Sequence, residues 1–282
     1  MNADCCIEMQ RLFDGLGCRT GNFVALQGYF DDSGDGGQKK IAAIGGVVGF
    51  TDQWTRFDKR WKRVMKEVSG CFHATDCESG QGKFKGWTVR KRNEVMERAV
   101  SAIISCGLRC VGIYVNIGEY RGVFSGTNAP EPYSLIFSHA VALAAMFGAQ
   151  APAMGQSSDT YIWHEGGSRD GKINEIFRQF RDLTEWPLSQ ILQAFAIGRK
   201  NFSAVQAADL VARETFKYAD NLGSGRNVRI PVKRLIEHIT FFPWTKECLE
   251  RLKSYGWPSG PMALIRCMTD NPPAGIMPRW PR

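Results

Sequence analysis

The sequence of 282 residues contains no uninterrupted apolar run of about 18 residues, the length that a helix needs to cross a bilayer. Its first segment carries Asp4, Glu8 and Asp14 and lacks the long apolar stretch of a signal peptide. No internal repeat or low-complexity tract is visible. We therefore expect a cytoplasmic protein without a membrane-spanning segment.

Three further absences disfavour particular kinds of site or enzyme. The nine cysteines lack the paired CxxC spacing of a structural zinc site, so reduced thiols that fill the core are favoured over zinc ligands. The glycine-rich stretch 34–37 lacks the following Lys-Ser or Lys-Thr of a phosphate-binding loop, which disfavours an ATPase. Ser33 stands where a phosphatase with Asp31 as nucleophile would need a second Asp, which disfavours that class.

The composition is that of a folded, basic protein. Hydrophobic residues make up 44% of the chain and charged residues only 23%, enough to build a large core. The formal net charge of +8 favours polyanions such as nucleic acid as partners. Candidates for phosphate contact are Arg56 and Arg60, in a basic helix expected after Thr51, and Lys83 and Lys85, in the following loop. A solvated helix face is the competing interpretation of the basic helix.

Hydrophobic periodicity predicts interleaved strands and helices, which is typical of an α/β domain. The first two strands are expected to form an antiparallel hairpin, and the prolines from Pro258 onward predict an irregular tail. Strands are expected at 23–32, 41–50, 108–117, 160–165 and 190–197, and helices from Thr51, the expected N-cap, and at 88–105, 133–148, 172–183, 204–221, 232–238 and 246–255. We divide the chain into an N-terminal extension (1–22), a central domain (23–222) and a C-terminal helical, Pro-rich extension (223–282).

Acidic residues stand at the ends of two expected strands and on a late helix. Asp31 and Asp32 end the first strand, Glu165 ends a later strand, and Asp209 lies in a helix among alanines. Carboxylates placed in this way can converge in one cleft, where a divalent cation relieves their repulsion. Each also has a structural interpretation: a polar turn for Asp31 and Asp32, a loop cap for Glu165, and an i,i+4 pair with Arg213 for Asp209.

Two motifs resemble the domain-of-unknown-function 3800 family. Residues 29–34, Tyr-Phe-Asp-Asp-Ser-Gly, are similar to its strand-ending Asp-Glu-Ser-Gly motif, with Asp32 where Glu is usual. Residues 205–212 are similar to its late Gln-x-Ala-Asp-Leu helix. The resemblance spans about residues 24 to 220 and implies a ribonuclease H-like fold, that is, a mixed sheet flanked by helices. The basic helix and the C-terminal extension are additions to that fold.

The resemblance also implies a site. It gives Asp31 as the first ligand of two Mg²⁺ or Mn²⁺ ions, Asp209 as the last and Glu165 between them, with Asp76 as a further catalytic candidate. The hypothesis is phosphodiester hydrolysis by two metal ions on RNA, DNA or a hybrid, with His73 or His164 as proton carriers. The alternative is a catalytically inactive module that binds nucleic acid or a protein. Family members are often associated with mobile elements or phage defence, which implies a similar role here.

Overall fold

The computed structural model describes residues 25–34, 40–222 and 227–270, and these ranges contain one mixed sheet. Its six strands lie in the order β5-β4-β1-β2-β3-β6, and β2 alone runs opposite to the other five. The strands are β1 (Leu26–Gly34), β2 (Ile41–Phe50), β3 (Arg109–Asn116), β4 (Thr160–Glu165), β5 (Leu192–Gly198) and β6 (Ile239–Trp244). The expected hairpin of the first two strands is confirmed.

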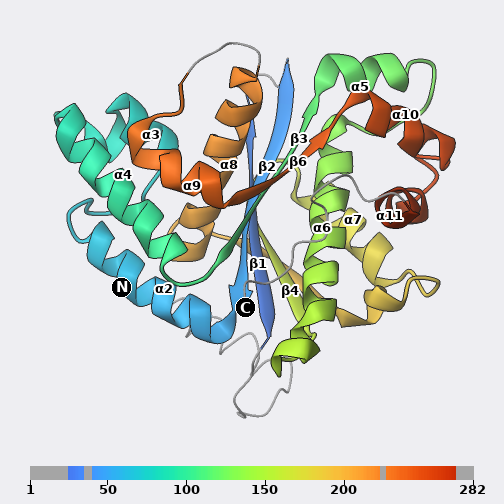
Figure 1. Ribbon diagram of the computed structural model, residues 1–282, viewed down its shortest axis with the longest axis horizontal. Helices are drawn as coiled ribbons and strands as arrows, with labels where there is room; N and C mark the ends of the chain where they lie inside the picture. Colours follow the sequence, from blue (N-terminus) through green and yellow to red (C-terminus); the bar gives the residue numbers. More distant parts are fainter. Residues whose placement is uncertain (1–24, 35–39, 223–226, 271–282) are drawn as a thin grey trace.

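Helices cover both faces of the sheet (Figure 1). One face carries α2 (Thr51–Met65), α3 (Ala74–Ser79), α4 (Val89–Ile104), α8 (Ser203–Asn221) and α9 (Lys233–His238). The other carries α5 (Ile117–Val123), α6 (Pro132–Gln150), α7 (Asp170–Arg181), α10 (Lys246–Ser254) and α11 (Pro261–Asp270). Short 3₁₀ turns are η1 (Gly82–Phe84), η2 (Ala151–Met154), η3 (Pro187–Ile191) and η4 (Ile230–Val232). The expected α/β class, a mixed sheet flanked by helices, is confirmed.

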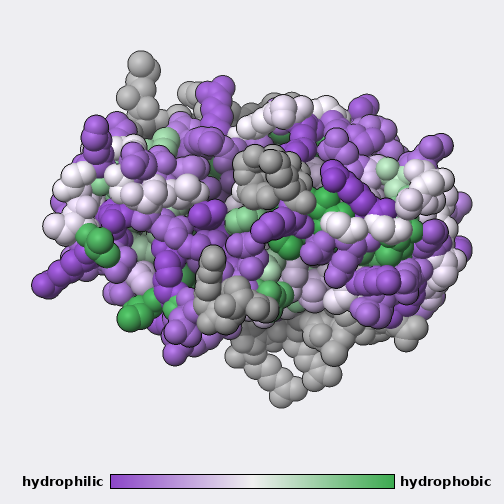
Figure 2. All heavy atoms as spheres, turned by 90° about the horizontal axis from the view of Figure 1, so that it is seen from above, coloured by the Kyte–Doolittle hydropathy of each residue, from purple (hydrophilic) through white to green (hydrophobic). Residues whose placement is uncertain are grey.

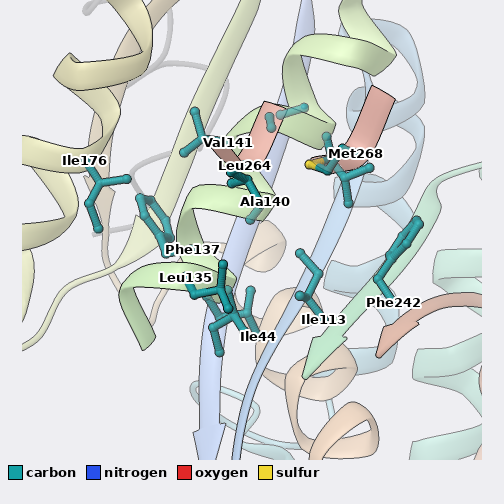
Figure 3. Packing of buried hydrophobic residues seen from close by; sticks show 14 of the residues in the cluster. Ile44, Ile113, Leu135, Phe137, Ala140, Val141, Ile176, Phe242, Leu264 and Met268 are labelled. Carbon is teal, nitrogen blue, oxygen red and sulfur yellow. The ribbon is translucent and has the colours of Figure 1, made fainter. Parts of the chain in front are cut away.

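Helix α6 forms the centre of one half of the core. Phe137, Ala140 and Val141 on α6 pack against strand residues such as Ile44 and Ile113 (Figure 3). By length and hydropathy alone the stretch Pro132–Met154 is able to span a membrane, but 83% of its most apolar window is buried inside this fold. Its apolar character is therefore explained by burial on all sides. The outer face shown in Figure 2 is mostly hydrophilic, with small separate hydrophobic patches.

Helix α2 forms as its apolar spacing predicts. The indoles and rings of Trp54, Phe57 and Trp61 are buried against the sheet and α4, whereas the basic side chains point outward. The expected N-cap is wrong by one residue, because Thr51 is the first helical residue and the chain enters the helix at Phe50. The side chain of Gln53 accepts from the Phe50 backbone N–H at 2.8 Å, which satisfies this one backbone donor at the start of the helix.

The last third of the chain is more regular than its prolines suggest. The expected irregular tail is wrong for Pro261–Asp270, which forms α11 with Pro261 at its first position, where the missing N–H of proline costs no helical hydrogen bond. The rest of that tail, 271–282, and the expected N-terminal extension, 1–22, lie outside the described residues. Sequence analysis also missed β6, which pairs with β3, and the short helices α3 and α5. The C-terminal extension thus supplies an edge strand as well as helices. The expected first strand is shifted, since β1 runs on to Gly34.

Helix α8 lies unusually close to the sheet, because glycines stand beneath it. Asp31, Gly45 and Gly112 are register partners across β1, β2 and β3. A Cβ atom at Gly45 would lie 2.0 Å from the backbone nitrogen of Ala212 on α8, and one at Gly112 would lie 2.5 Å from Oγ1 of Thr215. This row of missing side chains lets the α8 backbone approach the strand that carries Asp31.

Gly45→Ala is therefore expected to destabilise the protein strongly. The added methyl group meets helix backbone, which cannot rotate away, so we expect a loss of about 3 kcal/mol in the free energy of unfolding. Urea denaturation measures this loss. The control is Gly122→Ala on α5, where a Cβ meets no atom within 4 Å; equal stability of the two variants would contradict the close packing.

His139 is a core histidine, as its apolar neighbours predict. The indole N–H of Trp244 donates to its Nδ1 at 3.0 Å, so this nitrogen carries no proton. Burial lowers the pKa of His139 from 6.5 to about 3. The folded protein therefore keeps this ring neutral at pH values at which the unfolded chain takes up a proton.

This difference predicts a contribution to acid sensitivity. Because the pKa is depressed in the folded state, stability is retained above pH 6.5 and falls as the pH decreases toward 3, by about 1.4 kcal/mol per pH unit. His139→Gln keeps an acceptor for Trp244 without a titrating ring. We expect its stability to fall between pH 7 and pH 5 by about 2 kcal/mol less than that of the wild type. Urea titrations at both pH values measure this, with exposed His238→Gln as the control; equal pH slopes for all three proteins would contradict the assignment.

Candidate functional site

A cleft of about 310 Å³ opens where β1 and β4 end. The two strands are parallel neighbours, and Asp31 and Glu165 each follow directly after the paired residues Phe30 and His164. Side chains alternate between the faces of a strand, so Asp31 and Glu165 point to the face covered by α8. Asp209 of α8 lines the same cleft. The structure thus brings together the three carboxylates that the sequence proposed as metal ligands.

Asp31 is the most buried of these carboxylates. Its exposed fraction is 6%, and its Oδ1 accepts from the backbone N–H of Asp32 at 2.8 Å. Burial raises the pKa of Asp31 well above its usual value, and the negative charges of Asp209 and Asp32 raise it further. A polar turn is therefore the wrong structural interpretation of Asp31, which is a buried strand residue facing other acids.

Asp209 is held by the segment that begins α3. Its Oδ2 accepts from the Ala74 backbone N–H at 2.7 Å, and its Oδ1 lies 3.7 Å from Nε2 of His73. Burial raises the pKa of Asp209, while His73 and the Ala74 N–H oppose that rise. The alternative i,i+4 ion pair between Asp209 and Arg213 does not form, because Arg213 pairs with Glu78 at 3.3 Å.

Glu165 faces a lysine across the cleft. Its Oε1 lies 2.8 Å from Nζ of Lys200, in the loop between β5 and α8. The Glu165 side chain is 11% exposed and that of Lys200 is 64% exposed, so a buried acid is paired with a base at the rim. Glu165 is thus not a loop cap. It lines the cleft together with Asp31 and Asp209, and we call these three residues the acidic cluster.

Asp32 belongs to a separate network on the other face of the sheet. Its carboxylate pairs with Arg169 at 3.2 Å, and the Arg169 guanidinium stacks 4.6 Å from the ring centre of Tyr133. The alternation along β1 explains the separation, because neighbouring residues point to opposite faces. The choice of Asp31 as the residue that faces Asp209 and Glu165 is therefore consistent with the side-chain directions.

His164 closes this second network. Its Nδ1 lies 2.6 Å from the Glu165 carbonyl oxygen, which only accepts, so Nδ1 carries the proton and Nε2 accepts from the Tyr133 hydroxyl, also at 2.6 Å. Burial lowers the pKa of His164 to about 4, which agrees with a neutral ring. His164 is a buried strand residue that orders the end of β4, and both of its ring nitrogens are occupied.

Asp76 contacts the histidine that faces Asp209. Its Oδ1 lies 3.5 Å from Nδ1 of His73, whose Nε2 faces Asp209. His73, Asp76, Glu165 and Asp209 line an adjoining pocket. The structure therefore places Asp76 behind His73.

Gln206 ties the loops around the cleft together. Its Oε1 accepts from Nε1 of Trp61 at 2.9 Å and from the Phe72 backbone N–H at 3.1 Å, and its Nε2 donates to the carbonyl of Lys200 at 2.9 Å. One buried amide thus holds α2, the segment before α3 and the loop that carries Lys200.

The four basic residues proposed for phosphate contact do not line the cleft. Arg56 pairs with Asp52 at 2.6 Å on the exposed face of α2, and Arg60 bonds to Ser105. Lys83 and Lys85 are exposed around η1. These contacts agree with the solvated-face interpretation of α2.

Sequence reasoning missed the two permanent cations among the described residues that line the cleft. They are Arg169, which follows the end of β4, and Lys200, which follows the end of β5. Ligands in α/β proteins commonly bind beyond the carboxyl ends of parallel strands. Basic residues just after predicted strands were therefore the available signal.

The donor set fits a hard divalent cation in its chemistry. Three carboxylates from two strands and one helix line one cleft, and the negative charge of Asp209 raises the pKa of Asp31, an effect that a bound cation would relieve. Within residues 25–34, 40–222 and 227–270, no group of three or more His, Cys, Asp or Glu side chains stands in a metal-holding arrangement. In this structure Lys200 and His73 are the partners of Glu165 and Asp209.

The comparisons with known proteins give little. No family model and no curated protein matches the chain. Among solved structures, the chain is similar to a chain of the PCNA:RNase HII complex from Archaeoglobus fulgidus, with 12% identity, a TM-score of 0.35, and coverage of 75% of this chain and 87% of that one.

Gln206→Leu is expected to loosen this site and the fold together. It leaves the buried Trp61 and Phe72 donors without their acceptor, at a cost of about 2 to 4 kcal/mol in the free energy of unfolding. Chemical denaturation measures the change. Gln179→Leu on the exposed side of α7 is the control; if both variants lose the same stability, the amide does not hold the loops.

Proposed function

We propose that this chain is a divalent-metal-dependent nuclease with a ribonuclease H-like fold, of the family that its two motifs resemble. The observation that carries the proposal is the convergence of Asp31, Glu165 and Asp209 on one cleft. They come from two parallel strand ends and a helix far apart in the sequence. A purely structural role gives no reason for Asp31 to lie buried within reach of the negative charge of Asp209, because that repulsion costs stability.

The cations at the cleft support an anionic substrate. Arg169 and Lys200 line the cleft together with the acids, and the whole chain is basic. A guanidinium held by Asp32 and stacked on Tyr133 presents a fixed positive edge, which suits a phosphate group. We infer that the substrate is nucleic acid, the abundant polymer with the required charge.

The mechanism assigns each group a task. Asp31, Glu165 and Asp209 would hold Mg²⁺ or Mn²⁺, which supplies Lewis-acid activation for phosphodiester hydrolysis. Burial and the hydrogen bonds from Asp32 and Ala74 N–H fix the directions of the two aspartates. Arg169 would orient a phosphate, and Asp76 would orient His73 beside Asp209.

One observation favours a non-cutting module as the second candidate. Glu165 and Asp209 already have protein partners, and such pairs can be retained for structure alone. In that case the cleft would bind nucleic acid or a protein without hydrolysis. The test must therefore measure binding as well as cleavage.

Asp31→Asn and Asp209→Asn are each expected to lower metal-dependent cleavage at least about a hundredfold, because each removes a charged oxygen donor. Both asparagines keep an oxygen that accepts the existing backbone hydrogen bond, so folding is preserved. The measurement uses labelled single- and double-stranded RNA, DNA and hybrid with Mn²⁺, Mg²⁺ or EDTA. Thermal melting with and without metal runs alongside.

The matched control is Asp220→Asn, which removes an exposed charge at the end of the same helix. It is expected to cut as the wild type does. Metal-dependent cutting that survives in Asp31→Asn would refute the proposed site. Binding without cutting by every protein, wild type included, would favour the non-cutting module.

A further inference from the structure

Lys200 pairs with one member of the acidic cluster, its ammonium group lying 2.8 Å from Oε1 of Glu165. It lines the same cleft as Asp31 and Asp209. The Gln206 side chain donates to the Lys200 carbonyl at 2.9 Å and so fixes the backbone of Lys200 beside the acids. The lysine is thus directed to the cluster by the fold.

The two permanent cations among the described residues that line the cleft have different partners. The other permanent cation among the described lining residues, Arg169, pairs with Asp32 of the second network. Lys200 is therefore the permanent cation paired within the acidic cluster. Its charge lowers the pKa of both Asp31 and Asp209, against the burial that raises them.

The Lys200 side chain is exposed enough to move away from Glu165. It is 64% exposed, whereas Glu165 is 11% exposed, so the ammonium group approaches the buried acid from the solvent side. A long side chain held by one such ion pair gains little net stability from it. Moving the ammonium group into solvent requires rotation of that side chain alone.

We propose that Lys200 is the internal counter-cation of the acidic cluster and that a divalent cation must displace it from Glu165 in order to bind. The proposal rests on the proposed function for the identity of the cluster as a metal site. It adds that the Lys200–Glu165 ion pair competes with the metal ion for Glu165. Once displaced, the ammonium group remains at the mouth of the cleft, where a substrate phosphate would arrive.

A surface ion pair without this role would behave differently. Lys172 and Glu175 form such a pair on α7, at 3.0 Å with both side chains 49% exposed, and Lys172 does not line the cleft. Lys172→Met and Lys200→Met remove the same charge from the chain. Any difference in metal affinity between them reports the position of Lys200 and not the net charge.

The experiment is isothermal titration of the full chain with MnCl₂, without substrate, at fixed pH and ionic strength. Wild type, Lys200→Met and Lys172→Met are compared. We expect Lys200→Met to bind Mn²⁺ about fivefold more tightly than the wild type, the gain from not breaking one ion pair. Lys172→Met is expected to match the wild type. Melting curves should show a larger Mn²⁺-induced rise in Tm for Lys200→Met.

The outcomes separate this proposal from the proposed function. Equal Mn²⁺ affinity in all three proteins would overturn the role of Lys200 and leave the metal site standing. Weaker binding by Lys200→Met would also overturn it, by showing that the lysine assists the ion. No binding by any of the three would overturn both, whereas binding by Lys200→Met alone would support the displacement directly.

Discussion

The close contact of α8 with the centre of the sheet is the constraint on which the site depends. Asp209 lies one turn before Ala212, and Ala212 is the residue whose backbone rests against Gly45. Because Gly45 is the register partner of Asp31, the contact that seats the helix also sets the distance between the two acids. A side chain at Gly45 would push the helix, and Asp209 with it, away from β1.

The opposite directions of neighbouring strand residues divide the cleft into two parts. Asp31 and Glu165 face α8 and form the acidic cluster, whereas Asp32 and His164 face α6 and α7 and form a neutralised network with Arg169 and Tyr133. The two parts differ in charge although they are adjacent along the same strands. The acidic part has the character of a cation site, and the other part has a fixed guanidinium suited to an anion. The proposed hydrolysis of a phosphodiester with a metal ion would use both parts.

The cost of this arrangement is carried by the rest of the fold. Burial raises the pKa of Asp31 and Asp209, and the charge of Asp209 raises that of Asp31 further, so keeping these carboxylates ionised costs the folded state free energy. Large apolar layers on both sheet faces offset this cost, with α6 buried in one layer and the aromatic face of α2 in the other. Lys200 and His73 offset part of it within the cleft.

Residue patterns alone predict the α/β class, most of the strands and helices, and the candidates Asp31, Glu165 and Asp209. These follow from local patterns, because apolar periodicity reports which face of an element is buried and strand ends are marked by turn residues. Short elements such as α3 and β6 were not predicted, since a few residues carry too little periodicity to distinguish a helix or a strand from a loop. The family resemblance and its implied metal chemistry stay predictions.

Which acids meet, and which groups neutralise them, depends on how the elements pack. Asp209 is joined to His73 rather than Arg213, Glu165 is joined to Lys200, and Asp32 is joined to Arg169. Each of these pairs links residues separated by a strand, a helix or more of chain, so no local spacing encodes it. The pairs follow from strand order and from the approach of α8 to its glycines, which are properties of the packed molecule.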